Sequence, residues 1–246
     1  GGNYNVVVGD EAGTAITTGD GNVAVGYAAL STEDGHGRNV AIGNSALTNQ
    51  NAGVNAYNVA VGHSAGLSVT TGLNNTLIGG LAGDAITTAS HNTAVGTSAL
   101  GVNTTGAYNI AIGNYALDAN TTASSNTAVG YSSLGSNTTG AGNVAVGTNA
   151  LLDNTTGDNN TAVGNNSLFN NLTGTDNTVM GYESMKASTT GADNTSVGYQ
   201  SLYDNTTGAL NTALGHNSLA NNTTADRNTA VGHTALFDNT TGTKNT

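Results

Sequence analysis

Short phrases of alternating polar and apolar residues return along the chain at a fixed interval. Each phrase begins with Asn, continues with Thr or Val, then Ala, then usually Val or Ile, and ends with Gly. The alternation and the β-branched side chains are typical of a short strand. No stretch sustains a period of about 3.6 residues, and the high content of Gly, Asn and Thr opposes a helix. The pattern therefore predicts an all-β chain.

The phrase belongs to a 17-residue repeat that covers the chain from Asn5 onward. Its first residue recurs as Asn5, Asn22, Asn39, Asn58, Asn75, Asn92, Asn109, Asn126, Asn143, Asn160, Asn177, Asn194, Asn211, Asn228 and Asn245. Every step is 17 residues except one of 19, from Asn39 to Asn58. A strict repeat of this length indicates one unit stacked on copies of itself. We expect a parallel β-solenoid, or β-roll, of about fourteen 17-residue coils with two or three short strands each.

The repeats predict a single array over residues 1–246. The repeats over 5–91 are irregular, and those over 92–244 are regular. Residues 1–4 match the end of a preceding repeat, and Thr246 is the second residue of a further one. Solenoid ends normally carry atypical capping repeats. We therefore expect the chain to be a segment of a longer protein.

Counted from the first Asn as position one, several columns of the repeat have a constant character. Position four is apolar in every repeat, from Val8 to Val231, so we expect it to form the core, with position two on the same side. Position five is always Gly, which predicts a corner with positive φ or no room for a Cβ. Position eight is always Ala or Ser, which predicts close packing.

Positions nine and twelve change together. Position nine is usually Leu and position twelve usually Asn, but three repeats combine Gly13 with Ile16, Gly66 with Val69, and Gly83 with Ile86. The exchange indicates that both positions fill one part of the core. A buried Asn is costly unless it is hydrogen-bonded. We therefore expect the Asn columns at positions one and twelve to form two amide ladders between coils about 4.8 Å apart.

Composition excludes several classes of function. The net charge is −11 with only four Lys and Arg residues, which opposes binding to nucleic acid or to an anionic membrane. No apolar run approaches the roughly 20 residues of a membrane span, and no signal peptide is visible. Without Cys there can be no disulfide or thiolate zinc site. No nucleophile–base pair, phosphate loop or paired carboxylates stand out, so we expect no enzyme and no cofactor.

Each coil supplies only two or three large apolar side chains, which makes a thin core. Oligomerisation would bury more surface. The expected partner is therefore the chain itself.

The repeats resemble two families of surface proteins. The phrases at 39–43, 109–113 and 143–147 are similar to the head repeats of trimeric autotransporter adhesins. That resemblance implies a left-handed parallel β-roll built from three chains. The unit Asn-Thr-Ala-Val-Gly-Tyr-x-x-Leu-x-x-Asn-Thr-Thr-Gly at 126–140, and its near copy at 194–208, resembles repeats of bacteriophage tail-fibre proteins. The resemblance implies a homotrimer on a virion tail fibre or cell surface, outside the cell.

Position six is the variable column and is expected to be exposed. Its aromatic and His residues could bind a glycan or receptor of a host surface. They are Tyr27, His63, Tyr131, Tyr182, Tyr199, His216 and His233. His216 and His233 stand in adjacent repeats and are a weak candidate for a metal pair, but a solvated column is the simpler explanation, and we predict no metal site. Asp153, Asp204 and Asp238 at position eleven do not follow in consecutive repeats, and the Gly-rich calcium motif is absent.

Threonines at position fourteen form a second candidate column. They include Thr105, Thr122, Thr139, Thr156, Thr173, Thr190, Thr207, Thr224 and Thr241. Outward Thr arrays on a flat β-solenoid can order water and bind ice. The simpler explanation is a structural Thr ladder, because Thr favours strands and turns.

The sequence thus predicts a non-catalytic structural and adhesive rod of a phage tail fibre or cell-surface appendage. Attachment to a host or another surface would be its role. An ice-binding β-solenoid that uses the Thr arrays is the alternative.

Overall fold

A computed structural model describes residues 2–246, which divide into two compact units, residues 2–125 and residues 126–246. The chain is an all-β parallel β-solenoid of about 13 coils with about 17 residues per turn, and the described residues contain no helix. Each repeat has one strand of three residues, and turns and bends make up the remainder. The expectation of two or three strands per coil is therefore wrong.

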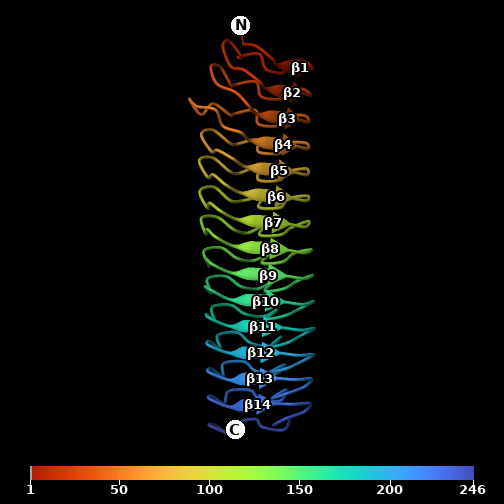
Figure 1. Cartoon of the computed structure of the whole chain (residues 1–246), viewed down its shortest axis with the longest axis vertical. Helices are drawn as coiled ribbons and strands as arrows, with labels where there is room; N and C mark the ends of the chain where they lie inside the picture. The colour runs from red at the N-terminus through yellow and green to blue at the C-terminus, as the bar shows by residue number, and fades with distance from the viewer. Residues whose placement is uncertain (1) are drawn as a thin grey trace. The chain divides into compact units, whose positions relative to one another are not determined.

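Each unit contains seven strands. The first unit holds β1 (Val6–Val8), β2 (Val23–Val25), β3 (Val40–Ile42), β4 (Val59–Val61), β5 (Thr76–Ile78), β6 (Thr93–Val95) and β7 (Ile110–Ile112). The second holds β8 (Thr127–Val129), β9 (Val144–Val146), β10 (Thr161–Val163), β11 (Thr178–Met180), β12 (Thr195–Val197), β13 (Thr212–Leu214) and β14 (Thr229–Val231). Figure 1 shows the strands of each unit in chain order, one coil after another.

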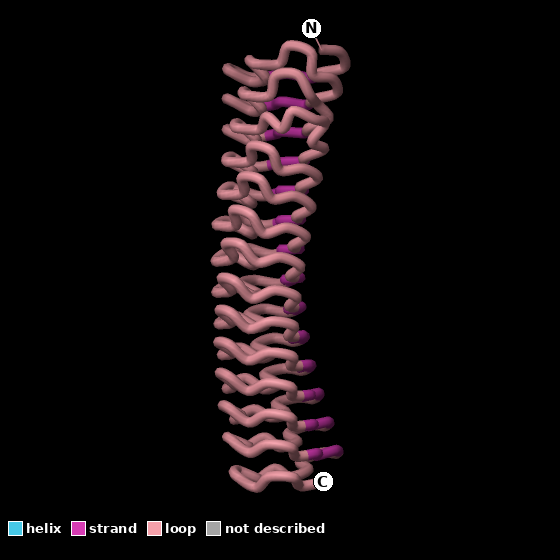
Figure 2. Tube along the Cα trace, turned by 90° about the vertical axis from the view of Figure 1, so that its left-hand side faces the viewer, coloured by secondary structure: helices cyan, strands magenta, loops and turns pink. Residues whose placement is uncertain are grey.

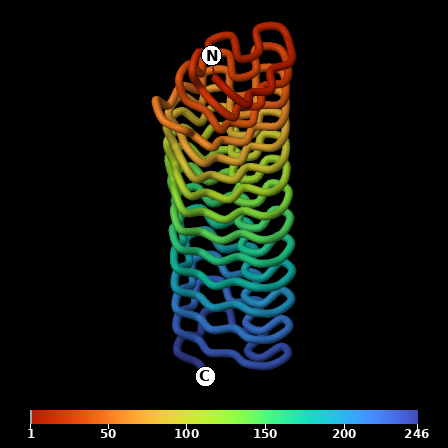
Figure 3. Tube along the Cα trace, turned by 45° about the horizontal axis from the view of Figure 1, so that its top comes forward, coloured from red at the N-terminus to blue at the C-terminus, as the bar shows by residue number. Residues whose placement is uncertain are grey.

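Within each unit the strands pair in parallel and in register. Thr161 lies beside Thr178, and Val163 lies beside Met180, so each residue meets its counterpart in the next repeat. The strands occupy one side of the coils, as Figure 2 shows, and the turns complete each circuit, as Figure 3 shows. The repeat period therefore equals one circuit of the backbone.

Position three of the repeat, rather than position four, faces the interior of the coil. Ala162 is fully buried, whereas Thr161 and Val163 on either side of it are half-exposed. Exposure at position four is 43% at Met180, inside the array, and 67% at Val231 in the last strand. The expectation of a core at positions two and four is wrong, because alternation defines two faces of a strand without telling which one is inside.

The core consists mainly of leucines at position nine, packed against small residues at positions three and eight. The largest fully buried side chains are Leu30, Leu47, Leu77, Ile86, Leu100, Leu117, Leu134, Leu151, Leu168, Met185, Leu202 and Leu219. The Ala and Ser residues at position eight are buried in most coils. The assignments of positions eight and nine to the interior are confirmed. One Leu per coil leaves room for little more than Ala at position three.

The exchange between positions nine and twelve is confirmed, and position three also takes part. A Cβ added to Gly83 would lie 2.7 Å from Leu77 Cδ2 and 2.8 Å from Ile86 Cδ1. A Cβ added to Gly66 would lie 2.7 Å from Leu77 Cδ1 and 3.3 Å from Val69 Cγ2. The large side chains at positions three and twelve therefore occupy the space that a leucine fills in other coils.

The glycine at position five needs both a special backbone conformation and close stacking. Gly164 has a φ of +136°, which side-chain-bearing residues rarely adopt. A Cβ there would lie 2.4 Å from the carbonyl oxygen of Gly181, its counterpart in the next coil. Both explanations offered by the sequence are therefore confirmed.

Other turns place non-glycine residues in the left-handed region. Asn159, Asn166 and Leu168, at positions seventeen, seven and nine of the repeat, have φ values of 58°, 52° and 51°. Asn tolerates this conformation, but for Leu it costs roughly 1–2 kcal/mol. Full burial of a Leu side chain contributes about 1.5–3 kcal/mol. Burial of Leu168 therefore offsets its backbone strain.

The two expected Asn ladders are present. At position one, the backbone N–H of Asn160 donates to Asn143 Oδ1 at 2.9 Å, and Asn160 Nδ2 donates to the Gly174 carbonyl at 2.8 Å. At position twelve, Asn171 Nδ2 donates to Asn154 Oδ1 at 2.8 Å and to the Gly174 carbonyl at 3.0 Å. Both amides thus meet at one carbonyl of their own coil, so each ladder joins neighbouring coils and also fixes the turn.

Ser188 interrupts the second ladder. It stands at position twelve, between Asn171 and Asn205, where neighbouring repeats have Asn. Ser188 Oγ and Asn171 Oδ1 are both buried without a hydrogen-bond partner. The Ser188 side chain is too short to replace the Asn amide, so the ladder at position twelve lacks one amide in this coil.

We predict that Leu168→Ala lowers the free energy of unfolding by about 2–5 kcal/mol, because it leaves a cavity in the core. Thr173→Ser, in the same coil, should change it by no more than about 0.5 kcal/mol, because its side chain is exposed and lies outside the strands. Urea denaturation followed by circular dichroism measures both. Equal losses for the two variants would contradict the assignment of Leu168 to the core.

We predict that Ser188→Asn raises the free energy of unfolding by about 1–2 kcal/mol, because it supplies the missing donor and acceptor of the ladder. Ser136→Asn is the matched control, since it adds an amide at position eleven, where Asn170 already stands half-exposed. Denaturant midpoints of the two variants and the parent make the comparison. A gain of the same size in the control would attribute it to something other than the ladder.

Candidate functional site

The outward residues of the strands form a continuous uncharged surface in each unit, which we call the strand face. In the second unit its position-two residues are Thr127, Val144, Thr161, Thr178, Thr195, Thr212 and Thr229. Its position-four residues are Val129, Val146, Val163, Met180, Val197, Leu214 and Val231. In the first unit, Ile42, Ile78 and Ile112 are among its exposed members. Its position-four row is apolar, and contiguous apolar surface marks interaction sites in soluble proteins.

The column at position six flanks the strand face, one glycine beyond each strand. Its predicted binding residues are all exposed, as expected: Tyr27, His63, Tyr131, Tyr182, Tyr199, His216 and His233. The column therefore lies where a ligand or partner could reach it.

Four of these rings form one continuous stack. The ring centroids of Tyr182 and Tyr199 are 5.4 Å apart, those of Tyr199 and His216 are 4.9 Å apart, and those of His216 and His233 are 4.9 Å apart. The planes differ by 12–16°. The faces of Tyr199 and His216 are thus covered by their neighbours, so a sugar cannot stack on them and would meet ring edges.

The same stacking bears on the candidate metal pair. Ring nitrogens bind a metal through lone pairs in the plane of the imidazole. His216 and His233 lie face to face with an interplanar angle of 16°, so their lone pairs do not converge on one point. This geometry does not suit a shared ion.

Most repeats have Thr at both position thirteen and position fourteen, and the two have different environments. At position thirteen, Thr155 Oγ1 donates to the Leu172 carbonyl at 2.9 Å, and Thr206 Oγ1 donates to the Thr223 carbonyl at 3.0 Å. At position fourteen the predicted column is exposed throughout: Thr105, Thr122, Thr139, Thr156, Thr173, Thr190, Thr207, Thr224 and Thr241. The structural Thr ladder is therefore confirmed at position thirteen. Ice binding at position fourteen stays a prediction.

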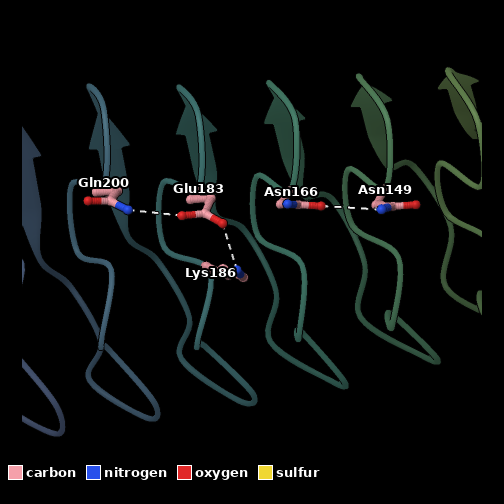
Figure 4. Close-up of polar contacts among 5 residues, drawn as sticks. All are labelled: Asn149, Asn166, Glu183, Lys186 and Gln200. Atoms are coloured by element: carbon pink, nitrogen blue, oxygen red, sulfur yellow. Dashed lines mark hydrogen bonds and ion pairs between the residues drawn. The ribbon is translucent and has the colours of Figure 1, made fainter.

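A row of polar side chains occupies position seven, as Figure 4 shows. Gln200 Nε2 donates to Glu183 Oε2 at 2.9 Å, and Lys186 Nζ lies 2.6 Å from Glu183 Oε1. Asn149 Nδ2 donates to Asn166 Oδ1 at 3.3 Å. Hydrogen bonds from Lys186 and then Gln200 hold the pKa of Glu183 below its usual range. The row is a local polar network that joins neighbouring coils.

A cluster of titratable side chains lies in the turn between β2 and β3, where Glu33, Asp34 and His36 place one ligand atom each within 4.8 Å of one another. Sequence reasoning missed this cluster. The signal was present in the alignment of repeats, because positions twelve to fifteen read Glu-Asp-Gly-His in place of Asn-Thr-Thr-Gly. A charged residue in the buried ladder column would have identified it.

Two aromatic contacts at position seventeen were also missed. His91 and Tyr108 stack with centroids 5.0 Å apart, and the Arg38 guanidinium lies 5.7 Å above the ring of Tyr57. The column at position seventeen is as variable as position six, which was the available signal.

No family model, curated protein or solved structure matches the chain. Residues 2–246 include no helix that could cross a bilayer, and no pocket was detected among them.

We predict that Glu183→Gln destabilises the protein at neutral pH, because it removes the ion pair with Lys186. The loss should be about 1 kcal/mol or less, since the pair is partly exposed. The pKa of Glu183 is lowered in the folded chain. The stabilisation that its carboxylate provides is therefore fully present above the pKa of the unfolded chain, which is about 4.3. It is lost as the pH falls through the lowered value. The free energies of unfolding of parent and variant should therefore become equal in acid. A difference that persists there would exclude the carboxylate charge as the cause.

Proposed function

We propose that this chain is a structural and adhesive rod segment of a phage tail fibre or a similar cell-surface appendage. It acts outside the cell as a homotrimer, attaches to a host or another surface, and has no catalytic role. The observation that carries the proposal is the exposed strand face. The resemblance of the repeats to tail-fibre and adhesin head repeats supports the biological setting.

The strand face is suited to contact copies of the same chain. It has no charged residue in any strand, so a partner selected by charge is disfavoured. Its side chains recur in every coil, so a second copy presents matching rows at the same spacing. Apolar area removed from water contributes about 25 cal/mol per Å², and the contribution grows with each coil that pairs.

Attachment to a host surface is assigned to the column at position six. In the stack from Tyr182 to His233, hydroxyl groups and imidazole edges are the parts left to contact a ligand. These groups can exchange hydrogen bonds with the hydroxyls of a glycan. Polar edge contacts replace the ring stacking that the sequence suggested.

Ice binding is kept as the second candidate because two Thr columns are accessible in the second unit. One is the position-fourteen column, and the other is the run of Thr161, Thr178, Thr195, Thr212 and Thr229 at position two. Both repeat once per coil. Regular rows of hydroxyl and methyl groups are the feature that favours this function.

We predict that the chain sediments as a trimer and that the double variant Val163→Glu, Val197→Glu sediments as a monomer, because burying two charges in the interface is unfavourable. Thr173→Glu is the control, since it adds a charge at exposed position fourteen and should leave the trimer intact. Analytical ultracentrifugation measures the mass. Circular dichroism confirms that the coils remain folded.

A parent chain that is monomeric at micromolar concentration would contradict the trimer. Thermal hysteresis and ice shaping test the second candidate on the same samples. Activity that disappears in Thr195→Glu or in Thr190→Glu would favour ice binding and would show which Thr column carries it. Absence of both effects at millimolar protein would exclude ice binding.

A further inference from the structure

The turn between β2 and β3 departs from the repeat where the second Asn ladder should pass. In the stacked column at position twelve, Glu33 stands between Ile16 of the preceding coil and Gln50 of the following one. Ile16 offers no hydrogen-bonding group. The Asn column at position twelve begins only at Asn103, so no Asn ladder passes through this turn.

Glu33 is a buried carboxylate that lacks a complete set of partners. Its side chain is fully buried. Oε1 accepts a hydrogen bond from the backbone N–H of His36 at 3.1 Å, whereas Oε2 is buried without a partner. A buried carboxylate must be neutralised by a proton, a cationic side chain or a metal ion.

Arg38, the nearest Arg or Lys in sequence, does not neutralise Glu33. Arg38 is exposed, its Nη1 donates to Tyr57 Oη at 3.1 Å, and its guanidinium packs over the Tyr57 ring. In the described part of the chain, Lys186 and Glu183 form the one salt bridge. A cation that is not part of the chain could therefore take this role.

His36 supplies a second unsatisfied atom. Its Nδ1 is buried without a hydrogen-bond partner. The ligand atoms of Glu33, Asp34 and His36 lie within 4.8 Å of one another, close enough for small side-chain movements to bring them around one ion. Asp34 is exposed, so one side of the cluster faces solvent.

We propose that Glu33, Asp34 and His36 bind one divalent transition-metal ion of the zinc class. Carboxylate oxygens and imidazole nitrogens are both ligands of Zn²⁺, and a site with three protein ligands leaves the fourth position to a water. The bound ion would connect positions twelve, thirteen and fifteen of one turn, which is the stretch that Asn fixes in regular coils. The site is independent of the attachment role and of the trimer.

The experiment uses the full chain, stripped with EDTA and titrated with Zn²⁺ by isothermal calorimetry. We expect one site per chain and a rise in thermal midpoint that depends on zinc concentration. Glu33→Gln and His36→Gln should each weaken binding by about 100-fold or more, since loss of second-shell groups alone costs about 10–100-fold. Gln is already accepted in this column at Gln50. His63→Gln, an exposed change, is the matched control and should bind as the parent does.

Histidine NMR gives a second readout that a purely structural role would not move. Zinc should shift the imidazole resonances of His36 alone among the five histidines. Circular dichroism checks that each variant is folded, and Asp34→Asn replaces Glu33→Gln if the latter is not. No stoichiometric binding by the parent, or parent-like binding by the folded variants, would overturn the proposal. Binding of Ca²⁺ without Zn²⁺ would also overturn it, because calcium does not require the imidazole.

Discussion

In most coils, the side-chain amide of the first Asn connects three parts of the backbone. For Asn160, Nδ2 reaches the carbonyl of Gly174 near the end of the same coil, and Oδ1 accepts the N–H of Asn177, which begins the next coil. These bonds are satisfied only when the same groups recur one circuit later. The burial of this amide therefore explains why the chain tolerates so little variation in repeat length.

The features that the sequence could predict are those in which one column constrains another. The repeats therefore indicated the two Asn columns, the Gly corner and the exchange between positions nine and twelve. They did not indicate which face of the strand is buried, because positions three and four are both apolar. Leu77 was the available signal that position three faces the interior: it is the one Leu at this position, and its side chain fills the space beside Gly66 and Gly83. The left-handed φ of Leu168 could not be predicted, since it depends on burial that only the closed coil provides.

The corrected orientation of the strands changes the functional argument more than it changes the fold. A column that was assigned to the core now forms the strand face, so the expectation of an oligomer rests on exposed apolar surface and not only on a thin core. Exposure of position six was predicted, but the stacking of Tyr199 on His216 was not, because spacing alone does not give ring orientation. The cluster at Glu33 was missed because its residues were compared with motifs and not with the ladder they replace.

Hydrogen exchange of Asn side-chain amides, measured by NMR, tests the central claim most directly. Asn160 and Asn171 are fully buried in the two ladders, whereas Asn165 in the same stretch is exposed. The side-chain NH₂ protons of Asn160 and Asn171 should exchange at least about 100-fold more slowly than those of Asn165, because exchange requires the coils to open. Equal exchange rates at all three residues would contradict the buried amide ladders on which the stacking of the coils depends.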